Sequence, residues 1–145
     1  MIKKFFKKEY FLIFCLIFLT NCATPYQKQT WYAYRGGYFD KKLSDNSFVI
    51  IFNGNALIFN TTAIDYALLR DAEVAKNNGF KYFTIAVNNE DTIYNEMYNN
   101  VKSLVNKPFV INIIYCYNNK PLKNSLKVYE VDETIKQIRY QYSIK

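Results

Sequence analysis

The sequence contains no histidine, and this absence excludes more than any other feature of its 145 residues. Histidine is the usual base of Ser-His-Asp and Cys-His catalytic sites, and it is a common zinc ligand. The acidic residues also form no Asp-x-Asp-x-Asp calcium loop. The sequence therefore excludes histidine-dependent nucleophilic catalysis and the usual zinc sites, and we predict no catalytic residue, no cofactor and no metal.

Cysteine is scarce as well, with three in the chain, and the second of them closes an apolar run. Nine uncharged residues, 11–19, follow a lysine-rich leader and end in Leu19-Thr20-Asn21-Cys22. A spanning helix needs about 20 apolar residues, whereas a shorter run after a basic leader suits a signal peptide. The pattern predicts a bacterial lipoprotein signal peptide over residues 1–21, with Cys22 lipidated. The alternative is an uncleaved N-terminal anchor helix.

A lipidated Cys22 would make a membrane the first partner of this protein. Two acyl chains suffice for stable anchoring. In bacteria that read the next residue, Asp favours retention at the inner membrane, and here that residue is Ala23. We therefore expect a protein of the cell envelope, anchored in the outer membrane and facing the periplasm.

The net charge of +7 and the remaining cysteine limit other functions. Residues 1–21 hold four Lys and one Glu, so the chain after cleavage keeps +4, with scattered lysines. This distribution does not favour nucleic-acid binding. Cys15 leaves with the signal peptide and Cys22 carries lipid, so Cys116 has no partner for an intramolecular disulfide. In an apolar strand, Cys116 should be buried and unreactive.

The rest of the chain predicts a lipidated tether over residues 22–35 and one α+β domain over 36–145. An extended 14-residue tether would reach about 45–50 Å. Apolar and β-branched runs predict strands, and helical spacing predicts helices. We expect a small, mostly antiparallel sheet with two or three helices on one face. The expected strands are 38–43, 47–52, 80–87 and 109–117, and the expected helices are 62–77, 92–105 and 129–138, with 140–144 as a possible further strand.

The helix over residues 62–77 has the clearest pattern. Thr61 and Thr62 are both suitable N-caps. Its expected apolar stripe consists of Ile64, Ala67, Leu68, Ala72 and Ala75. Asp71 falls inside that stripe, so it must lie near the stripe's edge or find a cationic partner.

Several short motifs resemble a family of small proteobacterial lipoproteins. They are Cys-Ala-Thr-Pro-Tyr-Gln at 22–27, Gly-Gly-Tyr at 36–38, Phe-x-Gly-Asn at 52–55, Asp-Tyr-Ala-Leu-Leu-Arg-x-Ala-Glu at 65–73 and Gly-Phe-x-Tyr-Phe at 79–83. The likeness is good over residues 22–87 and weaker over 108–138, and Asp71 stands where the family pattern has Ala. The resemblance implies an anchor and a fold, and it supplies no catalytic residues.

Two groups of residues are candidates for interaction. The aromatic residues of the tether, above all Trp31, Tyr32 and Tyr34, suit a membrane or protein interface, or they fold back onto the domain. Arg70 and Glu73 are a solvated surface pair, or Arg70 pairs with the tether or a second helix. We expect a non-enzymatic envelope lipoprotein that contacts a protein or cell-wall polymer. The alternatives are a carboxylate-dependent cell-wall hydrolase and a stress-sensing adaptor.

Overall fold

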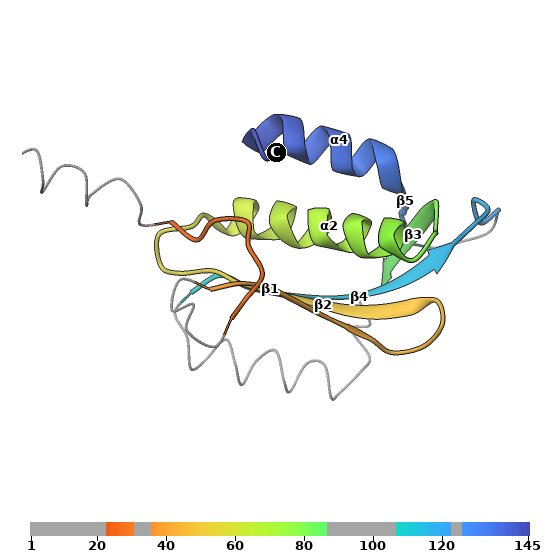
Figure 1. Ribbon diagram of the computed structural model, residues 1–145, viewed down its shortest axis with the longest axis horizontal. Coiled ribbons are helices and arrows are strands. Elements are labelled where there is room, and N and C mark those ends of the chain that lie inside the picture. The colour runs from red at the N-terminus through yellow and green to blue at the C-terminus, as the bar shows by residue number, and fades with distance from the viewer. Residues whose placement is uncertain (1–22, 31–35, 87–106, 123–125) are drawn as a thin grey trace, which may run out of the picture.

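The computed structural model describes residues 23–30, 36–86, 107–122 and 126–145. These residues form one antiparallel sheet with helices on one face, as predicted (Figure 1). The expected helix over 92–105 lies outside the described residues. The elements are β1 (Gly37–Lys42), β2 (Ser47–Asn53), α2 (Asn60–Asn77), β3 (Tyr82–Ala86), β4 (Phe109–Tyr117), β5 (Val128–Glu130) and α4 (Val131–Tyr142).

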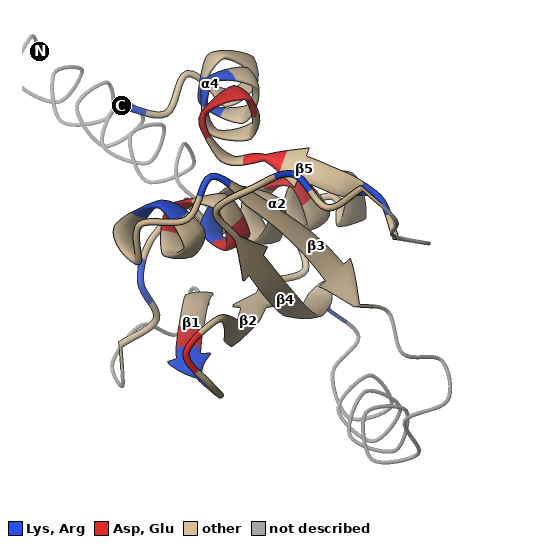
Figure 2. Ribbon diagram, turned by 90° about the vertical axis from the view of Figure 1, so that its right-hand side faces the viewer, with Lys and Arg blue, Asp and Glu red and all other residues tan. Residues whose placement is uncertain are grey.

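The sheet has the strand order β1-β2-β4-β3-β5, and each neighbouring pair is antiparallel. Phe48 pairs with Ile114, and Phe83 pairs with Cys116, so apolar side chains of three central strands face the same side. Helix α2 lies against β2 and β4, and α4 runs alongside α2 in the opposite direction (Figures 1 and 2). The core fills the space between the sheet and the two helices.

Small side chains let α2 approach the sheet closely. Ala63 and Ala67 pack with Phe52 and Ile58, while Ala72 and Ala75 join the larger core cluster around Phe83 and Ile114. All four alanines have no exposed surface. The alternation in β2, where Phe48, Ile50 and Phe52 are buried, supplies the large side chains that these alanines contact.

The expected orientation of α2 is wrong in one respect. Ile64 is 53% exposed, whereas Leu69 and Val74 are buried. Because α2 contacts the sheet on one side and α4 on another, its buried surface is wider than a single stripe. The helix also begins earlier than expected, with Phe59 rather than a threonine as its N-cap.

The C-terminal segment differs from the prediction as well. Residues 128–130 form strand β5, and the helix begins after it, at Val131. The possible strand over 140–144 is wrong, because α4 continues to Tyr142. The hydroxyl of Tyr142 donates a hydrogen bond to Asp65 at 2.6 Å, which holds the last turn of α4 against the start of α2.

Asp71 lies in the core and not at its edge, and the prediction of a cationic partner is wrong. It has no exposed surface, and its Oδ2 accepts a hydrogen bond from Nδ2 of Asn112 at 2.6 Å. Among the described residues, Oδ1 has no hydrogen-bond partner. Burial raises the pKa of Asp71 well above the ordinary value of a carboxyl group, and the bond from Asn112 opposes that effect. There is therefore a range of pH in which Asp71 stays protonated in the folded protein, whereas the same carboxyl group is ionised in the unfolded chain.

This raised pKa makes stability depend on pH. As the pH rises above about 4, where a free Asp ionises, the folded chain binds one proton more than the unfolded chain, so the free energy of unfolding falls. The fall continues up to the folded pKa, by at most about 1.4 kcal/mol per pH unit. Urea unfolding between pH 5 and 7 should show this slope for the wild type and lose it for Asp71→Asn. Replacing the exposed Asp45 with Asn is the control and should keep the slope; a slope unchanged by Asp71→Asn would contradict a protonated Asp71.

Candidate functional site

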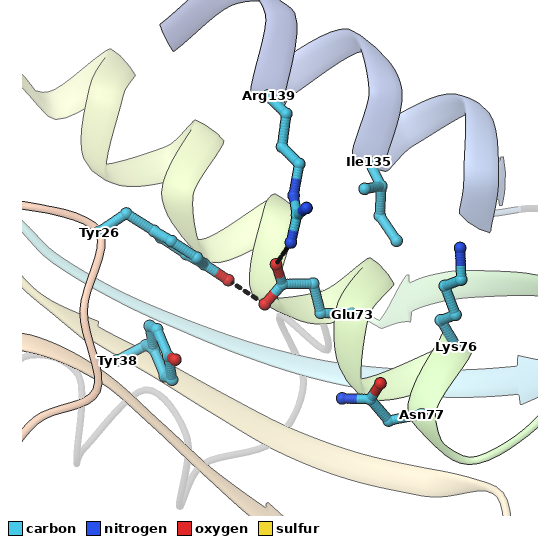
Figure 3. Close-up of a pocket in the computed structure, with 7 residues that line it drawn as sticks. All are labelled: Tyr26, Tyr38, Glu73, Lys76, Asn77, Ile135 and Arg139. Atoms are coloured by element: carbon cyan, nitrogen blue, oxygen red, sulfur yellow. Dashed lines mark hydrogen bonds and ion pairs between the residues drawn. The ribbon is translucent and has the colours of Figure 1, made fainter. Parts of the chain in front are cut away.

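Glu73 on α2 is the centre of a cluster of charged and aromatic side chains. Its Oε2 accepts a hydrogen bond from the hydroxyl of Tyr26 at 2.5 Å and one from Nη1 of Arg70 at 3.2 Å. Its Oε1 accepts a hydrogen bond from Nη2 of Arg139 on α4 at 2.8 Å (Figure 3). The Glu73 side chain is 13% exposed. One carboxylate therefore joins the N-terminal segment to both helices.

Arg70 connects this cluster to the edge strand β1. Its Nε and Nη2 lie 2.9 and 2.8 Å from Oδ1 of Asp40, and its guanidinium lies 4.4 Å above the ring centre of Tyr38. Burial works to lower the pKa of Arg70, but the hydrogen bond and charge of Asp40 outweigh burial and raise it. Arg70 and Arg139 face Asp40 and Glu73, so positive and negative charges balance within the cluster.

Residues 24–29 are folded onto the domain and do not form an extended tether. Thr24 is buried, and its Oγ1 accepts a hydrogen bond from the backbone N–H of Asn55 at 2.7 Å. The backbone N–H of Tyr38 donates to Gln27 O, and that of Gln29 donates to Tyr38 O, both at 2.8 Å. The segment thus pairs briefly, in parallel, with β1. The expected reach of about 45–50 Å is wrong, because these residues are not free to extend.

Glycine at the start of β1 allows this close approach. A Cβ on Gly37 would lie 2.4 Å from Gln27 O, and Gly37 has a φ of 139°. Any larger residue would push the N-terminal segment off the strand. Gly37 thus permits the close approach of two backbones that pair in parallel.

A row of tyrosines extends the cluster across the helices. The ring of Tyr26 lies 4.9 Å from that of Tyr38 and 5.5 Å from that of Tyr66. Tyr66 in turn lies 5.2 Å from Tyr142 on α4. Such ring pairs contribute about 0.5–1.5 kcal/mol each beyond their buried area. Burial and the hydrogen bond to Glu73 raise the pKa of Tyr26, so its hydroxyl remains a donor.

A pocket of about 490 Å³ opens beside this cluster. Side chains from the N-terminal segment, β1 and both helices line it, so that Glu73 and Tyr26 form one wall and α4 another (Figure 3). Arg139 is 42% exposed there, and Lys76 is held by Asp132 at 2.7 Å. The lining residues are Tyr26, Tyr38, Glu73, Lys76, Asn77, Ile135 and Arg139. The pocket offers hydrogen-bond donors, cationic groups and aromatic rings to a polar partner.

The structure places the predicted site residues in different ways. Arg70 and Glu73 pair with each other, but they are not a solvated surface pair, because their side chains are 16% and 13% exposed. The expected pairing of Arg70 with the tether or a second helix is wrong, because Arg70 bonds to Asp40 on β1 and to Glu73. It is Glu73 that bonds to both the N-terminal segment and the second helix. Trp31, Tyr32 and Tyr34 lie outside the described residues. The sequence did not single out Asp40 or Arg139, which lie 33 and more residues away from Glu73 and share no local pattern with it.

Cys116 is buried, as predicted, with 1% of its surface exposed. Burial, with a smaller effect of Asp71, raises the pKa of its thiol to about 12. A thiol of this kind is a poor nucleophile near neutral pH. Within the described ranges, no three His, Cys, Asp or Glu side chains gather as they would around a metal ion.

Comparisons with protein-family models, curated proteins and solved structures found no match to this chain. In the part of the chain that the structure describes, no helix has the length and apolar character needed to cross a membrane.

The bond between Tyr26 and Glu73 should contribute measurably to stability. Hydrogen bonds to charged groups contribute about 1.5–3 kcal/mol, so Tyr26→Phe should lower the free energy of unfolding by that amount in urea. Tyr140→Phe removes a hydroxyl from a ring that is 89% exposed and is the matched control, with an effect within about 0.5 kcal/mol. In a double-mutant cycle with Glu73→Gln, the two changes should be coupled by about 0.5–3 kcal/mol. Strictly additive effects would contradict the contact.

Proposed function

We propose that this protein is a lipid-anchored protein of the bacterial envelope with a non-enzymatic role. Lipid on Cys22 holds it in the outer membrane, facing the periplasm. Its α+β domain contacts an envelope protein or a cell-wall polymer through the pocket between the N-terminal segment and the helices. The observation that carries the proposal is the attachment of residues 24–29 to the domain, directly after the proposed lipidation site.

The leader and this attachment support the anchor together. The basic leader, the nine-residue apolar run and Cys22 have the order of a lipoprotein signal. The buried Thr24 follows Cys22 by two residues, and Tyr26 by four. A chain that joins its domain so soon after a lipid holds that domain at a fixed place on the membrane. Such positioning suits a protein that acts by contacting another molecule of the envelope.

The state of the reactive groups supports a contact role over catalysis. A general base needs an accessible carboxylate with a pKa near the working pH. Both oxygens of Glu73 accept hydrogen bonds, and two of the three donors are arginines, so the carboxylate is already engaged by side chains of the protein. Asp71 and Cys116 are buried and carry raised pKa values. These side chains are little exposed, whereas the exposed donors of Lys76 and Arg139 beside the pocket suit a partner.

The anchor is tested by metabolic labelling. Cells given a clickable fatty acid should label the wild-type protein, and Cys22→Ser should remain unlabelled and stay uncleaved. Cys116→Ser removes the buried thiol and is the matched control, which should label as the wild type does. Equal labelling of wild type and Cys22→Ser would contradict lipidation at this residue.

The contact role is tested by photo-crosslinking in intact cells. A photoreactive residue in place of Asn77, which lines the pocket, should give a discrete adduct. The same residue in place of Lys120, which is exposed three residues beyond the end of β4 and does not line the pocket, should not. Digestion with muramidase tells a cell-wall adduct from a protein adduct. The same adducts from both positions would contradict the pocket as the contact surface.

The competing hydrolase makes a different prediction. A second pocket, of about 310 Å³, has Asp65, Glu130 and Glu133 among its lining residues. Cleavage of purified cell wall that is lost in both Glu130→Gln and Glu133→Gln would favour the hydrolase over the contact role.

A further inference from the structure

The end of the domain nearest the proposed anchor exposes three large apolar side chains. Leu57 is 60% exposed, Phe59 is 79% exposed, and Ile64 is 53% exposed. Leu57 and Phe59 belong to the turn between β2 and α2, and Ile64 lies in the first turns of α2. We call these three residues the anchor-side patch.

The turn is held so that these side chains stay outside. Ile58, between Leu57 and Phe59, is buried against Phe52 and Ala63. The backbone N–H of Gly54 donates to Pro108 O at 2.7 Å, and that of Leu57 donates to Oδ1 of Asn55 at 3.1 Å. With Ile58 directed inward, its two neighbours in the turn are directed outward. The exposure of Leu57 and Phe59 is therefore built into the turn.

The same turn holds the start of the described chain. Thr24 Oγ1 lies 2.7 Å from the backbone nitrogen of Asn55, two residues before Leu57. Cys22 precedes Thr24 by two positions, so the Cα of the proposed lipidated residue lies within about 7 Å of the Cα of Thr24. The chain between the lipid and the turn is thus too short to lift this end of the domain clear of a membrane.

The composition of this end also suits a lipid surface. Residues 54–64, Gly-Asn-Ala-Leu-Ile-Phe-Asn-Thr-Thr-Ala-Ile, contain no charged side chain. Burying them at the headgroup boundary therefore removes no ion from water. At the opposite end of the sheet, the exposed Leu43 lies in the sequence between Asp40, Lys41 and Lys42 on one side and Asp45 on the other, and Figure 2 shows charged positions at the end of β1. Both ends expose apolar side chains, and among the residues that the structure describes the anchor-side end is the one that combines them with a charge-free stretch and the attached N-terminal segment.

We propose that the anchor-side patch inserts into the headgroup region of the membrane that holds the Cys22 lipid. The inference rests on the proposed lipidation. Insertion fixes which end of the domain meets the bilayer. The turn at 54–59 faces the lipid, while the β1–β2 hairpin and the end of β4 point away from it (Figure 1). The partner is a phospholipid surface, recognised by apolar side chains that the lipid anchor has already brought to it.

Tryptophan quenching in reconstituted vesicles tests the orientation. The full-length lipidated protein, carrying Trp31→Phe, is placed in phosphatidylethanolamine and phosphatidylglycerol vesicles that contain brominated phosphatidylcholine. Phe59→Trp reports on the patch, and Leu57→Trp is a second reporter if the first variant does not fold. Leu43→Trp, in the β1–β2 hairpin, and Leu122→Trp, after β4, are controls at the opposite end.

We expect the emission of Phe59→Trp to shift to the blue and to lose intensity with brominated lipid, and to resist aqueous acrylamide. The emission of Leu43→Trp and Leu122→Trp should not shift to the blue, should keep its intensity with brominated lipid, and should be quenched by aqueous acrylamide. Vesicle flotation and mass measurement of the lipid on Cys22 are made on the same samples. Absence of the lipid overturns the proposed function, and this inference with it. A lipidated, floating protein in which Phe59→Trp is unquenched, or in which all positions are quenched alike, overturns the inference alone.

Discussion

The carboxylate of Glu73 is the point at which three distant parts of the chain meet. Tyr26, Arg70 and Arg139 all donate to it, and Arg70 continues the connection to Asp40 on the edge strand. Removing one member of such a partly buried group leaves charges without partners, which is strongly destabilising. This one group contributes to the position of the N-terminal segment, to the packing of α4 against α2 and to the wall of the larger pocket.

The attached N-terminal segment changes what a lipid at Cys22 would do. A free tether lets a domain search the space above a membrane, whereas a segment bound through Thr24, Tyr26 and the short pairing with β1 would keep a domain lipidated at Cys22 close to the surface. The exposed Leu57 and Phe59 lie on the turn that binds Thr24. The N-terminal segment, the turn and the pocket thus belong to one folded unit, and a lipid at Cys22 would be attached close to it.

Much of the fold follows from local patterns in the sequence. The apolar run at 47–52 and the run at 109–117 form central strands, and Gly36-Gly37 marks the start of the edge strand. The features that could not be predicted from the sequence depend on tertiary contacts. Ile64 is exposed and Asp71 buried because α2 packs against two layers, and Arg139 reaches Glu73 only after α4 has folded back. The Arg70 and Glu73 pair was recognisable from spacing on a helix, but its partners Tyr26 and Asp40 were not.

Hydrogen exchange at the Gln29 amide tests the central claim, that the chain after Cys22 is part of the folded domain. This N–H donates to Tyr38 O at 2.8 Å. In the lipidated protein, its protection should match that of amides in β1, and Glu73→Gln should reduce it while the central strands remain protected. Exchange of Gln29 at the rate of an unstructured peptide would show that the segment is a free tether and would contradict the account.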